Sequence, residues 1–152
     1  MTTRVLIPSG ARGLNYDQVA LDRGIAMKPD IIAIDGGSTD SGPAYLGRGV
    51  SKYSRASTKI EWRGLMEARA KAGVPLVIGT SGTCGADTAV NWLLDLTREI
   101  ATDLRQSLKI AVLRCSQATA LMRTAVADGR RTPLRAEANG TASAFAHVTK
   151  SV

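Results

Sequence analysis

The sequence has few of the residues that build disulfide frameworks and zinc sites. Its 152 residues include two cysteines, Cys84 and Cys115, and a single histidine, His147. Two cysteines cannot form a disulfide framework, and a structural zinc site usually draws on several cysteine and histidine ligands. We therefore expect no structural disulfide and no metal site.

Aromatic residues are also scarce, with two tryptophans, three tyrosines and one phenylalanine. The net charge of +7 and the pI near 9.9 would suit a nucleic-acid partner, but platforms for base stacking are few and no nucleic-acid motif is present. The basic residues concentrate between Arg48 and Lys71. This pattern favours a rim that attracts small anions, or a plain solvated face, over a nucleic-acid interface.

Long apolar runs are missing too. No run approaches the ~20 residues that span a bilayer, and the N-terminal residues lack the apolar stretch of a signal peptide. We expect a cytoplasmic protein with no membrane partner. The length fits one domain, on the usual scale of about 100–200 residues.

What the sequence does contain is an alternation of strand and helix patterns. Short β-branched runs at residues 4–7, 30–34, 75–78 and 108–113 predict four buried strands. Helical spacing occupies residues 16–27, a stretch through Trp62 that ends at Gly73, residues 90–104, and a stretch from Ser116 to Gly129. The order predicts an open, mostly parallel α/β sheet of about four to five strands with helices on both faces, Rossmann- or flavodoxin-like.

Two segments depart from this scheme. The tail 136–152 has no clear period, so we assign residues 1–135 to the α/β domain and 136–152 to an irregular extension, with a last strand near 144–148 as the alternative. The connection 36–59 is far longer than the usual two to six residues between a strand and its helix. We expect another subunit to cover it, or the connection to fold over the ligand edge, with Tyr45, Leu46 and Tyr53 as its anchors.

Ligands of open parallel sheets bind beyond the carboxyl ends of the strands, where three loops are rich in Gly, Ser, Thr and Asp. Glycines admit close approach of a ligand, and hydroxyls and free N–H groups donate to carboxylate or phosphate oxygens. The candidate ligand-binding residues are Ser9, Gly10, Gly36, Gly37, Ser38, Thr39, Gly79, Ser81, Gly82, Thr83 and Gly85.

The third of these loops, residues 79–87, leads directly into a helix. We expect an anion or ordered waters at that helix start, with Ser81 and Thr83 donating. The alternative is a capped turn in which Asp87 satisfies the helix dipole. The loop is neither a Walker loop nor a Gly-x-Gly-x-x-Gly fingerprint, so neither ATP nor a dinucleotide is indicated.

Asp35 and Asp40 are the candidate catalytic residues, because Asp35 directly follows a predicted strand. Either could be a general base, bind a hydroxylated substrate, or hold the turn through Asx-type bonds. The string Asp35-Gly-Gly-Ser-Thr39 also resembles the phosphate-binding turn of sugar kinases and actin, although there the turn joins an opening β-hairpin. Cys84 and Cys115 could face the same edge, but no base partner is evident, which favours inert packing over nucleophilic catalysis.

Several strings together resemble the acyclic terpene utilisation family. They are Lys28-Pro-Asp-Ile-Ile-Ala-Ile-Asp-Gly-Gly-Ser-Thr-Asp-Ser-Gly-Pro43, Tyr45-Leu-Gly47, Ser54-Arg55 and Val74-Pro-Leu-Val-Ile-Gly-Thr-Ser-Gly-Thr-Cys-Gly85, within about residues 4–131. Family members usually run to several hundred residues, so the resemblance covers their N-terminal α/β portion. It implies a metabolic enzyme or enzyme subunit with lyase- or hydratase-type activity, working beside a small partner protein. The family's site residues would be Asp35, Gly36, Gly37, Ser38, Thr39, Asp40, Gly79, Ser81, Gly82 and Gly85.

The sequence thus predicts a domain that binds a small anionic metabolite, such as a carboxylate, a phosphate or an acyl-CoA, and belongs to a lyase- or hydratase-like enzyme. Two alternatives stay open: a non-catalytic interaction subunit that completes its site with a partner chain, and a kinase-like phosphate-binding module. No cofactor is indicated. We also expect a homo-oligomer or a partner subunit, because a chain shorter than its relatives would expose apolar surface that is internal in them.

Overall fold

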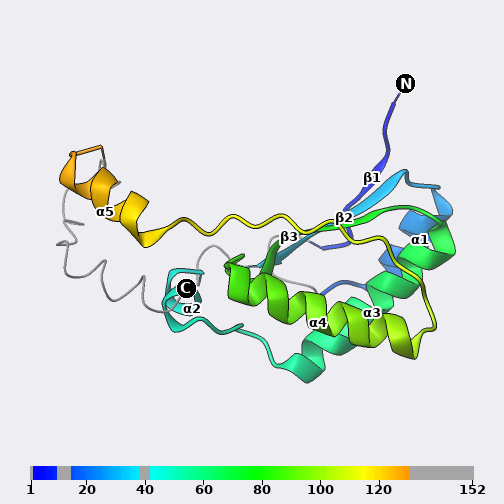
Figure 1. The fold of residues 1–152 in the computed structure, drawn as a ribbon. Coiled ribbons are helices and arrows are strands. Elements are labelled where there is room, and N and C mark those ends of the chain that lie inside the picture. Colours follow the sequence, from blue (N-terminus) through cyan, green and yellow to red (C-terminus); the bar gives the residue numbers. More distant parts are fainter. Residues whose placement is uncertain (1, 10–14, 38–41, 131–152) are drawn as a thin grey trace.

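The computed structural model describes residues 2–9, 15–37 and 42–130, which form an α/β fold (Figure 1). In chain order the elements are β1 (Val5–Leu6), α1 (Gln18–Ala26), β2 (Ile31–Gly37), α2 (Gly42–Arg48), α3 (Arg55–Ala72), β3 (Leu76–Thr83), α4 (Asp87–Asp103) and α5 (Thr119–Ala127). The predicted α/β class is confirmed. Gly10, Ser38, Thr39, Asp40 and the predicted extension 136–152 lie outside the described residues.

The sheet is open and parallel, in the order β1-β2-β3. Val5 pairs with Ile31 at one side of β2, and Ala33 pairs with Val77 at the other. Within residues 2–9, 15–37 and 42–130 there are three strands, fewer than the predicted four to five.

The fourth strand predicted at residues 108–113 is not formed. The arm, residues 105–118, has no regular secondary structure and runs from the end of α4 back towards its beginning. Arg114 donates to Asn91 at 2.6 Å, and the backbone N–H of Asp87 donates to the Ser116 hydroxyl at 3.0 Å. These contacts hold the arm on α4, and it makes no ladder with β3. The apolar pattern at residues 108–113 predicted a strand, but this segment pairs with no described strand and stays irregular.

The predicted helix ends agree with local capping. Asp17 accepts the backbone N–H of Ala20 at 2.7 Å before α1, and Ser54 accepts that of Ser57 at 3.1 Å before α3. Helix α3 ends at Gly73, whose φ of 68° suits glycine. Because α2 and the first turn of α3 lie within residues 42–59, the long predicted connection is partly helical.

The core lies on one face of the sheet, between β2 and helices α1, α3 and α4. Its fully buried side chains are Leu21, Ile32, Leu65, Leu96 and Ile100. Ile34 is also buried on this face, whereas Ile31 and Ala33 of the same strand are only half-buried on the other. The prediction of helices on both faces is therefore wrong for the described residues. In the order β1-β2-β3 each new strand is added on the same side of the one before it. Successive right-handed crossovers therefore place their helices on one face of the sheet.

The uncovered face, formed by Val5, Ile31, Ala33 and Val77, leaves large apolar side chains in contact with solvent. Val5 is 52% exposed and Val77 49% exposed. Parallel sheets are normally covered on both faces.

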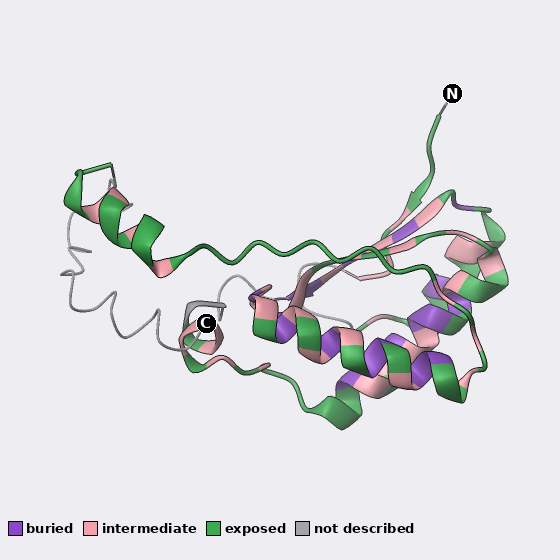
Figure 2. Cartoon of the chain, viewed as in Figure 1, coloured by how far each residue is buried: buried purple, intermediate pink, exposed green. Residues whose placement is uncertain are grey.

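Helix α5 stands apart from the rest of the fold (Figure 2). It forms where a helix was predicted and is followed by Gly129 at φ 65°, but none of its residues is buried. The start predicted at Ser116 is wrong, since α5 begins after Ala118 and Ser116 instead contacts the start of α4.

Ion pairs join α3 to α4 and account for much of the basic run. Glu99 pairs with both Arg55 and Lys59, and Lys59 also contacts Asp103 at 3.0 Å. The hydrogen bonds from Arg55 and then Lys59 lower the pKa of Glu99 from 4.5 to about 2. Arg55, Lys59 and Arg63 of α3 thus form ion pairs with Glu99 and Asp103 of α4. These pairs weaken the interpretation of the basic run as a rim that attracts anions.

We predict that Glu99→Gln lowers stability at neutral pH and that the difference from the unchanged protein disappears on acidification. A carboxyl whose folded pKa is depressed stabilises the fold above its unfolded pKa of about 4.5, and that stability is lost as the pH falls towards about 2. Urea unfolding between pH 7 and pH 2 measures it, with Glu67→Gln, which removes a pair within α3, as the control. A difference that persists at pH 2 would contradict the assignment.

Candidate functional site

The candidate site lies at the carboxyl ends of β2 and β3, where the strand register changes. Asp35 pairs with Gly79, but the next pair is Gly37 with Thr83. Three residues of β3, numbers 80–82, therefore lie opposite the single residue Gly36. The excess length forms a bulge at the edge where the sequence predicts ligand binding.

The bulge holds two β-branched residues in unusual backbone conformations. Thr80 has a φ of 48° and Thr83 a φ of 86°. A positive φ is a genuine outlier for a β-branched residue, and such strain concentrates at functional sites. The sequence offered no signal for these conformations, because threonine is a residue that the pattern places in a strand.

The glycines of the site differ in what surrounds them. A Cβ at Gly37 would lie 2.3 Å from the Thr80 side chain, and a Cβ at Gly82 would lie 2.9 Å from the Ala89 carbonyl oxygen. These two glycines allow backbone segments to pack closely. Gly79 has open space at its Cβ position. Of these three predicted ligand-binding glycines, Gly79 is thus the one that a ligand could approach without a rearrangement.

Asp35 holds the turn that ends β2. Its carboxylate accepts the backbone N–H of Gly37 at 3.0 Å, which is the Asx-type bond foreseen as one of its three roles. The side chain belongs to the same face of β2 as Ala33, away from the helices. Asp40, the other candidate catalytic residue, lies outside the described residues.

Thr83 joins the site to a strap, residues 51–53. Its side chain is 1% exposed, its hydroxyl lies 3.2 Å from the Ser51 hydroxyl, and it accepts the backbone N–H of Lys52 at 3.1 Å. This part of the long connection therefore folds over the ligand edge, as one of the two predicted arrangements requires. The Lys52 ammonium lies 5.7 Å from the centre of the Tyr53 ring, so the strap carries positive charge beside this edge.

A small cavity lies beneath the strap. Its volume is about 10 Å³, close to the lower limit for one water molecule, and its lining includes Gly36, Ser51, Tyr53, Thr58, Glu61, Ile78, Gly82, Thr83, Trp92 and Leu93. A metabolite does not fit this volume. Ligand binding at this place requires the strap to move away from Thr83.

Glu61 lines the cavity but is not among the candidate residues predicted from the sequence. Burial raises its pKa above the ordinary value, and the Tyr16 hydroxyl donates to its backbone carbonyl at 3.0 Å. The spacing of Thr58, Glu61 and Leu65 along α3 is the signal that could have identified it, since residues three and four apart share one helix face.

Other predicted residues lie at or near this edge without entering the cavity lining. Ser81 accepts the backbone N–H of Gly85 through its carbonyl, at 3.1 Å, which closes the loop before α4. Ser9 follows β1, on the far side of β2 from β3. Cys84 is half-buried and Cys115 exposed, and both are free thiols.

One backbone N–H group at the start of α4, that of Asp87, is hydrogen-bonded by the arm. Besides the contact from Asp87 N–H to Ser116, the Ser116 N–H reaches the Asp87 carboxylate at 3.4 Å. Asp87 thus contacts the arm, and no side chain caps the helix at Ala86. An anion at this helix start remains a prediction.

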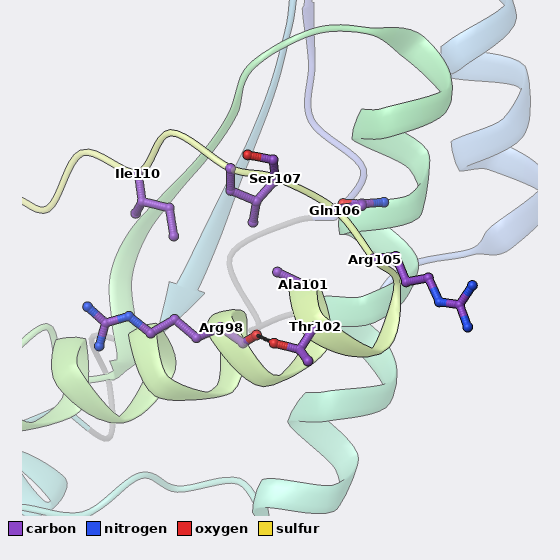
Figure 3. Close-up of a pocket in the computed structure, with 8 residues that line it drawn as sticks. Arg98, Ala101, Thr102, Arg105, Gln106, Ser107 and Ile110 are labelled. Carbon is purple, nitrogen blue, oxygen red and sulfur yellow. Dashed lines mark hydrogen bonds between the residues drawn. The ribbon is translucent and has the colours of Figure 1, made fainter.

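A second depression, of about 610 Å³, lies between α4 and the arm (Figure 3). Its two arginines, Arg98 and Arg105, extend in opposite directions (Figure 3). Their charges do not converge on one point, and the depression is at the end of α4 remote from the strap.

No family model, no curated protein and no solved structure matches the chain. Among the described residues, no helix is long and apolar enough to cross a membrane, and no group of three or more His, Cys, Asp or Glu could hold a metal ion.

Proposed function

We propose that the chain is a small-anion-binding domain of a metabolic enzyme with lyase- or hydratase-like chemistry, related to the acyclic terpene utilisation family and located in the cytoplasm. The ligand is a carboxylate, a phosphate or an acyl-CoA ester. The observation that carries the proposal is Thr83, a buried β-branched residue with a positive φ whose hydroxyl bonds to the strap.

The strap and the bulge together provide the chemistry that an anion needs. The hydroxyls of Ser51 and Thr83 already lie 3.2 Å apart, and the Lys52 N–H points to the same oxygen. When the strap lifts, these donors become free to bond to a ligand oxygen, and hydrogen bonds to a charged group are about twice as strong as neutral ones. Until then these donors are hydrogen-bonded to one another, so none of them is buried without a partner.

Asp35 and Glu61 provide two carboxyl groups of different character. Asp35 follows β2 directly and is held by Gly37 N–H, so it is the candidate general base. Glu61 has a raised pKa through burial in the cavity, which suits a proton donor. A lyase or hydratase moves a proton onto or off carbon or oxygen. Glu61 lies beneath the strap, where it can do so, whereas the Asp35 side chain lies on the other face of β2 and acts only on a ligand that extends around the end of the sheet.

A ligand screen tests the binding part of the proposal. Acetyl-CoA, succinate and inorganic phosphate are compared by thermal shift, because a ligand that binds only the folded state raises the melting temperature. We predict that Thr83→Val weakens the best of them by about 10- to 100-fold, the range that one hydrogen bond to a charged group, about 1.5–3 kcal/mol, supplies. Calorimetric titration measures the affinity.

Two controls make the result specific. Thr102→Val removes a hydroxyl that bonds only within α4 and should leave affinity unchanged. Glu61→Gln should shift the pH profile of any turnover without abolishing binding. If none of the three compounds raises the melting temperature, or if both threonine variants lose affinity equally, the anion site is refuted.

The alternative of a non-catalytic interaction subunit is favoured by a different observation. The uncovered face and α5 are both apolar surfaces with no partner among the described residues. Binding of an anion and association with another chain use separate surfaces, so each is tested on its own.

A further inference from the structure

The uncovered face is too apolar to remain in water as the surface of a parallel sheet. Its four side chains, those of Val5, Ile31, Ala33 and Val77, carry no charge and lie in neighbouring pairs across three strands. With strands about 4.8 Å apart, the outer two strands are about 10 Å from one another. That is the width that one α-helix covers.

Helix α5 also has an apolar surface that is not buried. Leu121, Met122, Ala125 and Val126 form a stripe on one side of the helix, yet Leu121 is 53% exposed and none of the four is buried. A helix of nine residues is marginal in water by itself, because isolated helices shorter than about 12–15 residues seldom persist. Its stability must come from packing of this stripe.

The arm keeps α5 away from the sheet of its own chain. Arg114 and Ser116 attach the arm to α4, and only two residues separate Ser116 from Thr119, where α5 begins. The chain continues outwards from this point, so α5 projects beyond the carboxyl edge of the sheet (Figure 1). An element that projects on an extended arm, with a matching surface that no other described residue covers, is the geometry of exchange between two copies.

We propose that the chain forms a symmetric dimer in which α5 of each copy packs on the uncovered face of the other. Helix α5, about 14 Å long at 1.5 Å per residue, is long enough to span the roughly 10 Å from β1 to β3. The exchange covers both apolar surfaces at once, and it leaves Arg123, on the opposite side of α5 from the stripe, in water. The inference is independent of the proposed anion site.

Light scattering after size exclusion, on the full chain from 5 to 200 µM, tests the dimer. We expect the unchanged protein to be a dimer and both Leu121→Glu and Val77→Lys to raise its dissociation constant at least about tenfold, since each buries a charge in an apolar contact. Thr124→Gln, on the polar side of α5, should leave it unchanged. Circular dichroism confirms that each variant is folded. A monomeric unchanged protein, or a Leu121→Glu variant that dimerises normally, would overturn the proposal.

A cross-link separates exchange from folding back within one chain. In a Cys84→Ser, Cys115→Ser background, Val77→Cys and Leu121→Cys are placed on separate copies, which are mixed, refolded together and treated with a short bismaleimide. Exchange gives a cross-linked product of two chains. A doubly substituted chain that cross-links only to itself at 5 µM would show α5 on its own sheet and would overturn the exchange.

Discussion

Replacing Trp62 with alanine should lower the free energy of unfolding by about 3–5 kcal/mol, the usual cost of removing a buried tryptophan. The Trp62 side chain on α3 is 5% exposed, and its indole N–H donates to the Thr97 hydroxyl of α4 at 2.8 Å. The Thr97 hydroxyl in turn donates to the Leu93 carbonyl at 2.7 Å. The substitution therefore opens a cavity between the two helices and removes their buried hydrogen bond.

Two milder variants separate these contributions. Trp62→Phe keeps most of the apolar volume and loses the N–H, so we expect a loss of roughly 1–2 kcal/mol. Thr97→Val leaves the indole N–H without its acceptor and should cost about 1–3 kcal/mol. Urea unfolding monitored by circular dichroism measures all three. Equal losses for Trp62→Ala and Trp62→Phe would mean that packing between α3 and α4 contributes little.

Gly82→Ala should cost about 2–4 kcal/mol, because it combines backbone strain with a collision. Gly82 has a φ of 65°, which side-chain-bearing residues adopt at a cost of about 1–2 kcal/mol. The new Cβ would also lie 2.7 Å from the Ala89 Cβ and 2.9 Å from the Ala89 carbonyl oxygen. Since α4 begins at Asp87, relief of this contact requires the helix to move away from β3.

Gly79→Ala is the matched control, because its Cβ would meet open space. We expect its stability to change by less than about 1 kcal/mol. Equal destabilisation by Gly79→Ala and Gly82→Ala would show that the bulge tolerates neither side chain and that the distinction drawn from its geometry is wrong.

Among the described residues, the three strands and every helix except α2 could be predicted from local features. Apolar spacing placed α3 and α4, and Gly73 marks the end of α3 through its own backbone preference. Such features depend on residues within one or two turns of each other, and the sequence contains them in full. The strand predicted at residues 108–113 was wrong because a strand exists only where a second strand pairs with it, and no local pattern contains that partner.

Part of the geometry of the candidate site could be predicted. Glycine-rich segments were expected to meet at one edge of the sheet, and the ends of β2 and β3 do meet there, with Asp35 making the turn-holding bond that its type favours. The contact of Thr83 with Ser51 joins residues 32 positions apart, and the cavity includes Glu61 from a third element. Contacts of this kind depend on how far the strap folds back, which composition and spacing do not specify.

The sequence by itself determined the α/β class, the parallel strands β1, β2 and β3, and the edge at which polar loops gather, because each follows from periodicity and from residues with strong local preferences. Only the tertiary structure decided that α1, α3 and α4 share one face, that the strap closes over Thr83, and that α5 stands on an arm. The physical reason is the same in each case: these features depend on which distant surfaces exclude water together, and that depends on strand order and chain direction in space.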